Sequence, residues 1–446
     1  MKKLKVAIGL SGGVDSAISA YLLKKHGFDV SGVYLHCFDE DAPGCRGRQD
    51  RQDAIKVALH LKIPFQVLDF IRQYKAAVIN YFKKEYLAGR TPNPDVVCNR
   101  DIKFGLFLDW AIKKEFDAIA TGHYAKLIRK TRNTRKTRDS ENTRPALRHS
   151  DGLTFRPSEF SEFSEIYLVQ PKDLHKDQTY FLWQVPKHRF SRVLFPLSNF
   201  CKSEVRSLAK LAKIPVAAKP DSTGICFVGE VKVENFLKSL GVEEKAGNVI
   251  VKICDSENSE NSENQNTGLS VNQKSRSDSL KLRSSGDIRP SEYSEFSGHI
   301  HADSCYRIIG THRGVAFYTI GQRHGFSTDL GPWSLALGPN FDPPPFYVIA
   351  KDVKTNRLIV GFGSECYRNS FEVSDCNWFL RPSSFVLRPL LVRLRHLGSL
   401  IPCRLELITN ELMNVFLSIP QRGIAPGQSA VFYSKEGIVL GGGVIQ

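Results

Sequence analysis

The sequence lacks the features that would place it in a membrane or in a disulfide-rich class. No run of 18 apolar residues occurs in the 446 residues, and such a run is the usual mark of a transmembrane helix. The 10 cysteines show neither dense spacing nor a Cys-x-x-Cys pair, which argues against a disulfide framework and against a metal-binding scaffold. The start, MKKLKVAIGLSGG, has a basic tip but no apolar stretch of signal-peptide length. We therefore expect a cytoplasmic protein without a membrane partner, with two to four domains at roughly 100–200 residues each.

The sequence also has fewer acidic than basic residues. Lys and Arg number 62 against 46 Asp and Glu, which gives a formal net charge of +16. An excess of this size suits a polyanionic partner such as RNA. It equally suits a protein that surplus charge keeps soluble, and the charge alone leaves both interpretations open.

Short apolar runs alternate with longer amphipathic segments through residues 4–122. This alternation predicts an α/β domain built on a doubly wound parallel sheet, with ligands bound beyond the carboxyl ends of the strands. The predicted strands are 5–10, 30–36, 65–68 and 117–120, and one predicted helix begins near Asn99.

After residue 300 the pattern changes to short strands separated by turn signals such as Pro-Gly and Gly-Gly. This pattern is typical of a small all-β terminal domain, a sandwich or a barrel. The strands predicted there include 346–349, 358–360, 403–408 and 430–433.

Two segments interrupt this regularity. Residues 129–165 are rich in Arg, Thr, Ser and Glu, and residues 255–298 are rich in Ser. Neither can bury enough apolar surface to offset the entropy of ordering, so we predict that both are disordered. Residues 156–164 match residues 289–297 at eight of nine positions, and we interpret the two segments as insertions of one mobile sequence into surface loops.

The residues with the most specific chemistry are Gly9–Ser16, GLSGGVDS, between the first predicted strand and the first helix. Glycines let the backbone approach a ligand closely, and a helix N-terminus binds anions. Ser11 and Ser16 add hydroxyl donors, whereas Asp15 would repel phosphate directly and is expected to act through Mg²⁺. Because no Gly-Lys-Ser/Thr follows, this is not the Walker type of phosphate loop.

Five further motifs lie in a fixed order along the chain. They are NPDVVCN at 93–99, TGHY at 121–124, KDQ at 176–178, DSTGICF at 221–227 and PGQ at 426–428. Together with SGGVDS, they make the chain resemble the bacterial tRNA-specific 2-thiouridylases of the PP-loop ATP pyrophosphatase superfamily. The resemblance implies ATP-dependent 2-thiolation of the wobble uridine in tRNAs for Lys, Glu and Gln, with release of AMP and diphosphate.

The resemblance also implies a domain organisation. Residues 1–190 would form the ATP-binding catalytic domain, similar in fold to the adenine nucleotide alpha hydrolases, and 220–238 would return to it with Cys226. A small central domain would comprise 191–219 and 239–342. Residues 343–446 would form a β-barrel domain that contacts tRNA.

Site residues follow from the resemblance position by position. Cys226 would carry a persulfide received from a sulfur-relay protein or a cysteine desulfurase, Cys98 would be its partner, and Asp95 would act as general acid/base. ATP would be held by Gly9, Leu10, Ser11, Gly12, Gly13, Val14, Asp15, Ser16, Leu35 and Gly122. The target base or the tRNA would be contacted by Asn93, Pro94, Asp95, His123, Lys176, Asp177, Gln178, Arg395, His396 and Gln428.

The two cysteines suit sulfur transfer because a thiolate is a strong nucleophile. We expect the pKa of Cys98 to be lowered by the N-terminus of the helix predicted to begin near Asn99 and by neighbouring Arg100 and Lys103. In some members of the family, an Asp and two Cys like Asp95, Cys98 and Cys226 are held to bind an iron–sulfur cluster. The sequence does not decide between a persulfide and a cluster.

Three alternatives stay open at this point. A relative that uses ammonia, such as a lysidine-type ligase, would need the nucleotide loop but no paired cysteines. A non-catalytic tRNA-binding protein would need neither. His123 could be a core histidine at the end of the fourth strand, and His396 stands where the family usually has Tyr, which weakens its assignment.

Overall fold

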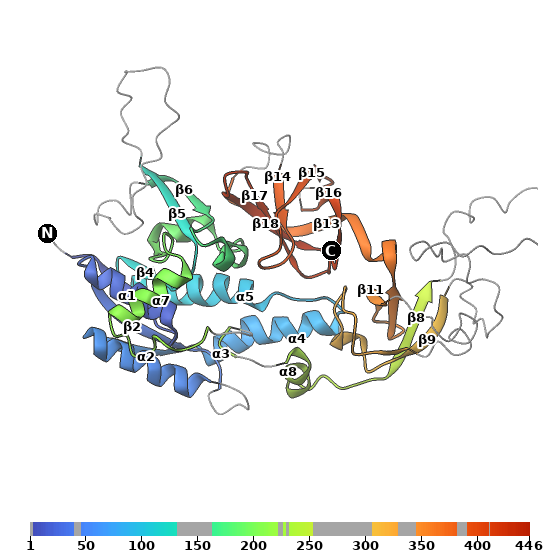
Figure 1. Ribbon diagram of the computed structural model, residues 1–446, viewed down its shortest axis with the longest axis horizontal. Coiled ribbons are helices and arrows are strands. Elements are labelled where there is room, and N and C mark those ends of the chain that lie inside the picture. Colours follow the sequence, from blue (N-terminus) through green and yellow to red (C-terminus); the bar gives the residue numbers. More distant parts are fainter. Residues whose placement is uncertain are drawn as a thin grey trace, which may run out of the picture. The chain divides into compact units, whose positions relative to one another are not determined.

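The computed structural model describes residues 3–39, 46–131, 163–221, 226–228, 232–252, 306–328, 345–380, 390–409 and 411–446 (Figure 1). The chain divides into two compact units. Met1–Glu243 with Tyr367–Gln446 forms the first unit, and Glu244–Cys366 forms the second. Among the described residues no helix is long and apolar enough to span a bilayer.

The first unit contains a five-stranded parallel sheet in the order β3-β2-β1-β4-β7. This confirms the predicted α/β fold class. The strand order reverses beside β1, so the loops that follow β1 and β4 meet at the position where such sheets bind ligands. The strands are β1 (Lys5–Gly9), β2 (Asp29–His36), β3 (Phe65–Asp69), β4 (Ala118–Ala120) and β7 (Val193–Leu194).

Helices cover this sheet because alternate strand residues are apolar on both faces. Val6 and Ile8 of β1 belong to a core cluster with α1 (Val14–Lys25), α2 (Gly47–Leu61) and α7 (Lys202–Leu211). Ala7, between them, is also fully buried. The remaining helical segments before β4 are α3 (Ile71–Tyr74), the π-helix η1 (Lys75–Ile79), α4 (Asn80–Leu87), α5 (Pro94–Val97), the π-helix η2 (Cys98–Leu106) and α6 (Phe107–Lys113).

The helix predicted to begin near Asn99 begins five residues earlier in the structure. The continuous helical segment α5–η2–α6 begins at Pro94, with Asn93 as its N-cap residue, and not near Asn99. Proline is favoured in the first helical turn because its missing N–H would have no partner there. Cys98 therefore lies inside the helix and not at its end.

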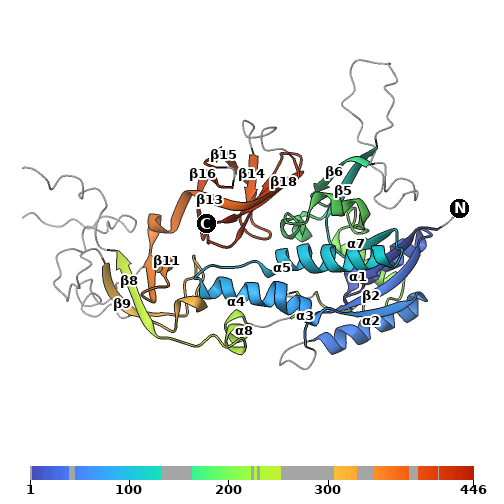
Figure 2. The same cartoon turned by 180° about the vertical axis from the view of Figure 1, so that it is seen from behind.

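The segment predicted to be disordered over 129–165 is ordered at both of its ends. β5 (Lys126–Thr131) pairs antiparallel with β6 (Phe163–Val169), which Figure 2 shows as a hairpin. Backbone pairing orders these residues despite their polar composition, so the prediction is wrong for 129–131 and 163–165. Residues 132–162 and 255–298, and most of the near-repeat, lie outside the described residues.

Short elements complete the α/β part of the first unit, which is the part outside the C-terminal barrel. They are the 3₁₀ helices η4 (Leu174–Lys176), η5 (Thr179–Phe181) and η6 (Lys187–Arg192), and the helix α8 (Val233–Ser239).

The second unit contains a five-stranded sheet in the order β10-β9-β8-β12-β11. The strands predicted at 346–349 and 358–360 belong here, because β12 pairs in parallel with β8. Two expected domain boundaries are therefore wrong. Residues 191–219 belong to the first unit, because they contain β7, a strand of the first sheet, and α7, which packs in the core of that sheet. The terminal barrel begins at Tyr367 and not at residue 343. The elements are β8 (Gly247–Lys252), β9 (Tyr306–His312), η9 (Val315–Phe317), β10 (Ser327–Thr328), β11 (Tyr347–Asp352), β12 (Arg357–Gly361) and η10 (Gly363–Cys366).

The C-terminal residues form a closed six-stranded barrel, which confirms the predicted β-barrel. Alternate residues point inward, as in β15 where Ile401, Cys403 and Leu405 are buried and the residues between them are exposed. In barrel order the strands are β13 (Tyr367–Trp378), β16 (Met413–Arg422), β15 (Ile401–Leu407), β14 (Leu390–Arg393), β17 (Ser429–Tyr433) and β18 (Val439–Ile445).

A buried ion pair fastens this barrel to the α/β part of the first unit. Arg393 Nη1 of β14 donates to Asp177 Oδ2 at 2.7 Å, and the two side chains are 6% and 0% exposed. Thr179 N and Oγ1 donate to the other oxygen of Asp177, and Tyr180 OH donates to the Ser429 carbonyl at 3.0 Å. The carboxylate thus has partners from both sides of the contact.

Substitution of Asp177 by Asn should leave Arg393 buried without a counter-charge. Breaking a buried pair in this way typically costs about 3–5 kcal/mol, and we expect a loss of that size in a urea titration. Glu406→Gln is the matched control, since its partner Arg404 and Glu406 itself are 65% and 57% exposed, and it should leave the midpoint in place. Equal midpoints for Asp177→Asn and wild type would contradict the assigned role of the pair.

Candidate active site

The loop after β1 is built around close backbone approaches. Gly12 has φ +75°, and a Cβ atom there would lie 2.2 Å from the Asp50 carbonyl oxygen. A Cβ atom on Gly122, in the loop after β4, would lie 2.7 Å from the Ser16 amide nitrogen. Both positions therefore require glycine, and the two loops meet beside the N-terminus of α1.

Two serines hold the loop in shape. Ser11 N donates to Ser16 Oγ at 3.2 Å, and Ser16 Oγ donates to the Gly13 carbonyl at 3.1 Å. The start of α1 consequently presents its unpaired N–H groups beside an ordered turn, which is the usual form of a phosphate site.

A network of charged side chains borders this loop. Lys202 Nζ lies 2.8 Å from both carboxylate oxygens of Asp15 and 2.8 Å from Asp221 Oδ1. Lys176 also binds Asp221, at 2.7 Å. Although burial raises the pKa of Asp221, the hydrogen bonds from Lys176 and Lys202 hold it well below its usual value. The network joins the loop Gly9–Ser16, called the nucleotide loop below, to Asp221, five residues before Cys226.

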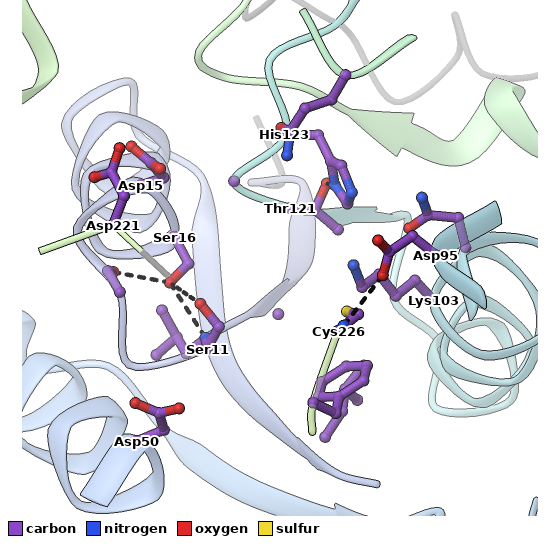
Figure 3. A pocket seen from close by; sticks show the side chains of 18 of the residues that line it. Ser11, Asp15, Ser16, Asp50, Asp95, Lys103, Thr121, His123, Asp221 and Cys226 are labelled. Atoms are coloured by element: carbon purple, nitrogen blue, oxygen red, sulfur yellow. Dashed lines mark hydrogen bonds between the residues drawn. The ribbon is translucent and has the colours of Figure 1, made fainter. Parts of the chain in front are cut away.

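One cavity of about 500 Å³ is lined both by residues of the loop after β1 and by Asp95 and Cys226. Figure 3 shows Ser11, Asp15 and Ser16 on one side of this cavity and Asp95 and Cys226 on the other. The predicted site residues that line it are Gly9, Leu10, Ser11, Gly13, Val14, Asp15, Ser16, Leu35, Asp95, Gly122, His123, Lys176, Gln178, Cys226 and His396. Those absent from its lining are Gly12, Asn93, Pro94, Cys98, Asp177, Arg395 and Gln428.

The two cysteines singled out in the sequence are neighbours. Cys98 Sγ lies 3.8 Å from Cys226 Sγ, although 128 positions separate them in the chain. Two hydrogen bonds hold the Cys226 backbone: its N–H donates to Asp95 Oδ1 at 3.1 Å, and Tyr74 OH donates to its carbonyl at 2.6 Å. Both thiols are free, and a small movement would bring them within bonding distance.

Cys226, and not Cys98 as predicted, has the lowered pKa. The thiol of Cys98 donates a hydrogen bond to Cys226, and with the charge of Lys103 this lowers the pKa of Cys226 to about 7 despite its burial. Burial and the neighbouring Cys226 raise the pKa of Cys98 well above its usual value. The helix dipole does not help Cys98 because it lies beyond the first turn, and Arg100 binds Asp101 instead.

The sequence analysis named Lys103 only as a charge beside Cys98 and missed it as a residue that faces Cys226. Figure 3 shows its side chain extending towards Cys226 beside Asp95, and Lys103 and Cys226 both line the cavity. Burial raises the pKa of Asp95, while the charge of Lys103 opposes that rise. The signal in the sequence was its spacing of five from Cys98, which indicates a shared face only in a π-helix.

Several predicted tRNA contacts have other partners. Asp177 is enclosed with Arg393 and is fully buried, so it is not available to RNA as predicted. Gln428 Nε2 donates to the carbonyls of Thr91 and Pro92 at 2.9 and 3.2 Å. These two side chains join the barrel to the α/β part of the first unit. Asn93 is only 9% exposed and stands at the N-cap position of α5 without a side-chain capping hydrogen bond.

His123 lies in the core, as the alternative interpretation of this residue expected. It is 8% exposed, its Nδ1 lies 2.8 Å from Thr121 Oγ1, and its ring packs against Phe104 and Phe195. Burial and the charge of Lys103 hold the pKa of His123 well below its usual value. One edge of this neutral ring still lines the cavity.

Other predicted contacts remain accessible near the cavity. Arg395 is exposed, and the ring of His396 lies 4.4 Å from that of Phe181, with both residues lining the cavity. Gln178 accepts a hydrogen bond from Tyr124 N at 2.9 Å and so fixes the loop after β4. Two aromatic rings beside a basic side chain suit contact with a nucleotide.

The predicted ligands of an iron–sulfur cluster do not assemble as a metal site. Across the described part of the chain, no group of three or more His, Cys, Asp and Glu side chains is arranged to hold a metal ion. The Lys103 ammonium interacts with Asp95, Cys98 and Cys226 alike, which places a positive charge where a cluster would need room. The carboxylate of Asp15 is the kind of ligand that Mg²⁺ binds in proteins.

Three family models match successive parts of the chain. Residues 4–230 match the family described as "tRNA methyl transferase HUP domain". Residues 291–362 match its PRC-barrel domain, and residues 368–445 match an aminomethyltransferase β-barrel domain.

Curated relatives align from end to end. The tRNA-specific 2-thiouridylase MnmA of Nitrosomonas europaea is 33% identical over 450 residues, covering 100% of this chain and 99% of that protein. Its namesake in Thiobacillus denitrificans is 33% identical over 446 residues, covering 99% of both chains. A solved structure of the U34-tRNA thiolase NcsA of Methanococcus maripaludis, with its 4Fe–4S cluster, has 16% identity and TM-score 0.30, over 54% of this chain and 66% of that chain. A likeness that low supports no argument about mechanism.

The thiol assignment predicts how Cys226 is alkylated as the pH changes. Because its pKa is lowered to about 7, the thiolate should form through pH 7 and its reaction with iodoacetamide should rise there. Cys98→Ala removes the hydrogen bond and should move this midpoint upward, towards the ordinary value of about 8.5. Peptide mass spectrometry gives the rates, and Cys376, whose pKa burial raises to about 11, is the internal control. An unchanged midpoint in Cys98→Ala would contradict the assignment.

Proposed function

Because the chain belongs to the family of tRNA-specific 2-thiouridylases, we propose that it replaces the C2 oxygen of a wobble uridine in tRNA with sulfur, using ATP. The observation that carries this proposal is the shared cavity. The loop Gly9–Ser16 and Cys226 line one space of about 500 Å³, and the Cys98 sulfur lies 3.8 Å behind that of Cys226, so activation and sulfur delivery can act on the same base.

The nucleotide end would bind ATP through its backbone. The α1 N-terminus, Ser11 and Ser16 would hold the phosphates, and Leu35 at the end of β2 would lie against the adenine, with Gly122 leaving room for both. Mg²⁺ carried by ATP would take the Asp15 carboxylate and neutralise phosphate charge there. The lysines around Asp15 would then be free to turn towards the phosphates.

The first chemical step would activate the uridine. Its C2 oxygen attacks the α-phosphorus of ATP, the N3 proton leaves, and diphosphate departs. Asp95 is suited to take that proton, because burial raises its pKa and so makes it a better base than an ordinary carboxylate. The C2 oxygen becomes part of an AMP leaving group.

The sulfur steps would follow at the other end. The outer sulfur of a Cys226 persulfide attacks C2, and AMP leaves with the electrons of the C–O bond. Cys98 loses its proton and attacks Cys226 Sγ, which lies 3.8 Å away. The bond to the outer sulfur breaks, its electrons stay with the base, and N3 regains a proton. The product is 2-thiouridine with a Cys98–Cys226 disulfide, which a thiol reductant must reopen.

The tRNA would be held mainly through its phosphates. A net charge of +16 favours such a partner, and Arg395 with the His396–Phe181 pair offers a cation and a stacking surface beside the cavity. The uridine must leave the anticodon stack to enter. We propose tRNAs for Lys, Glu and Gln as substrates and a sulfur-relay protein or cysteine desulfurase as sulfur donor.

The direct test is formation of the product by purified protein. The reaction contains ATP, Mg²⁺, a cysteine desulfurase with cysteine, and tRNA transcripts for Lys, Glu and Gln. Digests are searched by mass spectrometry for 2-thiouridine. Wild type should form it, Cys226→Ala should form none, and Cys201→Ala, outside the cavity, should match wild type.

Each other outcome identifies a different activity. Diphosphate release without 2-thiouridine would favour an ammonia-using ligase, and tRNA binding without diphosphate release would favour a non-catalytic protein. Thiolation by Cys226→Ala would keep the function but overturn the sulfur carrier.

A further inference from the structure

We propose that Lys103 is a catalytic residue of the sulfur-transfer steps and not of adenylation: its ammonium stabilises negative charge on the sulfur that Cys226 carries. This inference rests on the proposed function. It divides the reaction between the two ends of the cavity and assigns a separate cation to the sulfur end.

The first support is the local helix geometry. In an α-helix with 3.6 residues per turn, residues five apart point in different directions. The segment Cys98–Leu106 is a π-helix, in which hydrogen bonds run from residue i to i+5 and residues five apart lie near one face. This brings Lys103 to the side of Cys98 that faces Cys226. Such π-helical turns are frequent at functional sites, and a simple α-helix would lose the alignment.

The second support is what surrounds the ammonium. Its side chain extends towards Cys226 beside Asp95 (Figure 3), and its ammonium lies 5.6 Å from the centroid of the ring of Phe227, the residue after Cys226. Although desolvation lowers the pKa of Lys103, the negative charge of Cys226 and of Asp95 raises it above its usual value. A lysine in such surroundings is stable only with compensating negative charge, and sulfur supplies part of that charge here.

The third support is the contrast with the other lysines that line the cavity. Lys176 is paired with Asp221 at 2.7 Å, and Lys219 is paired with Asp50 and Asp53 at 2.7 Å each. Within the described residues, Lys103 makes no such ion pair with a carboxylate. The lysines at the nucleotide end thus have carboxylate partners, whereas Lys103 has a thiol partner.

Negative charge forms on this sulfur twice in the proposed reaction. It is present on the outer sulfur of the Cys226 persulfide before it attacks C2. It returns to that sulfur when Cys98 attacks Cys226 Sγ and the S–S bond breaks towards the base. A fixed cation beside the sulfur lowers the energy of both states, because it is already in place when the charge forms.

The test separates the two halves of the reaction. Full-length wild type, Lys103→Met, Lys103→Arg and Arg100→Met are compared with a Lys tRNA transcript. Arg100→Met is the matched control, since it removes a cation from the same helix whose partners are Asp101 and Gln184. Adenylation is measured as the first turnover of diphosphate without sulfur. Thiolation is measured in one turnover after a cysteine desulfurase has loaded Cys226, with the persulfide quantified by mass spectrometry.

We expect Lys103→Met to adenylate within about threefold of wild type and to thiolate about 10²–10³-fold more slowly, the usual effect of removing one preorganised electrostatic partner. Lys103→Arg should recover at least tenfold of that loss, and Arg100→Met should resemble wild type. Unchanged thiolation in Lys103→Met, or equal losses in both halves, would overturn the inference.

Two further outcomes are decisive. If Lys103→Met does not fold, Lys103→Arg and Lys103→Gln replace it, and equal thiolation by these two would overturn the inference. If wild type itself forms no 2-thiouridine, the proposed function fails, and the role of Lys103 fails with it.

Discussion

The contact between the sulfur atoms of Cys98 and Cys226, 3.8 Å apart, is the constraint on which the rest of the site depends. It requires a segment 128 residues downstream to return to the helical segment α5–η2–α6. Asp95 and Tyr74 hold that segment through its amide and its carbonyl, and Lys103 extends towards its sulfur. The arrangement makes Cys226 the more acidic thiol and leaves Cys98 as the proton-bearing partner, which is the asymmetry that a sulfur carrier and its resolving thiol need.

The parallel sheet explains why a nucleotide loop borders the same space. Reversal of strand order beside β1 opens a crevice between the loops after β1 and β4. Glycines at 12 and 122 let those loops touch the neighbouring backbone. Lys202, shared by Asp15 and Asp221, then connects this crevice to the Cys226 segment. A phosphate group bound at the loop after β1 and a base held beside Cys226 would therefore lie in the same cavity.

The sequence predicted the fold class and the motif residues of the cavity, because glycine spacing and strand–helix alternation are local signals. It named Lys103 only as a charge beside Cys98 and not as a residue that faces Cys226, since an α-helical spacing would turn Lys103 away from Cys98. It misjudged the thiol pKa values because the local sequence does not show which side chains are buried. Asp177 illustrates a third limit: its motif matched a tRNA contact, but its partner Arg393 lies 216 residues away. The strands β11 and β12 were assigned to the barrel because their parallel partner β8 lies far back in the chain.

The most direct measurement of the central claim, that adenylation and sulfur delivery act on one C2 atom, follows the oxygen that leaves. A tRNA transcript with ¹⁸O at C2 of the wobble uridine is thiolated in the presence of ATP, and the products are weighed by mass spectrometry. The shared cavity predicts one ¹⁸O in the phosphate of AMP for each 2-thiouridine formed. Recovery of the label in water or in diphosphate, with thiolation intact, would contradict the account.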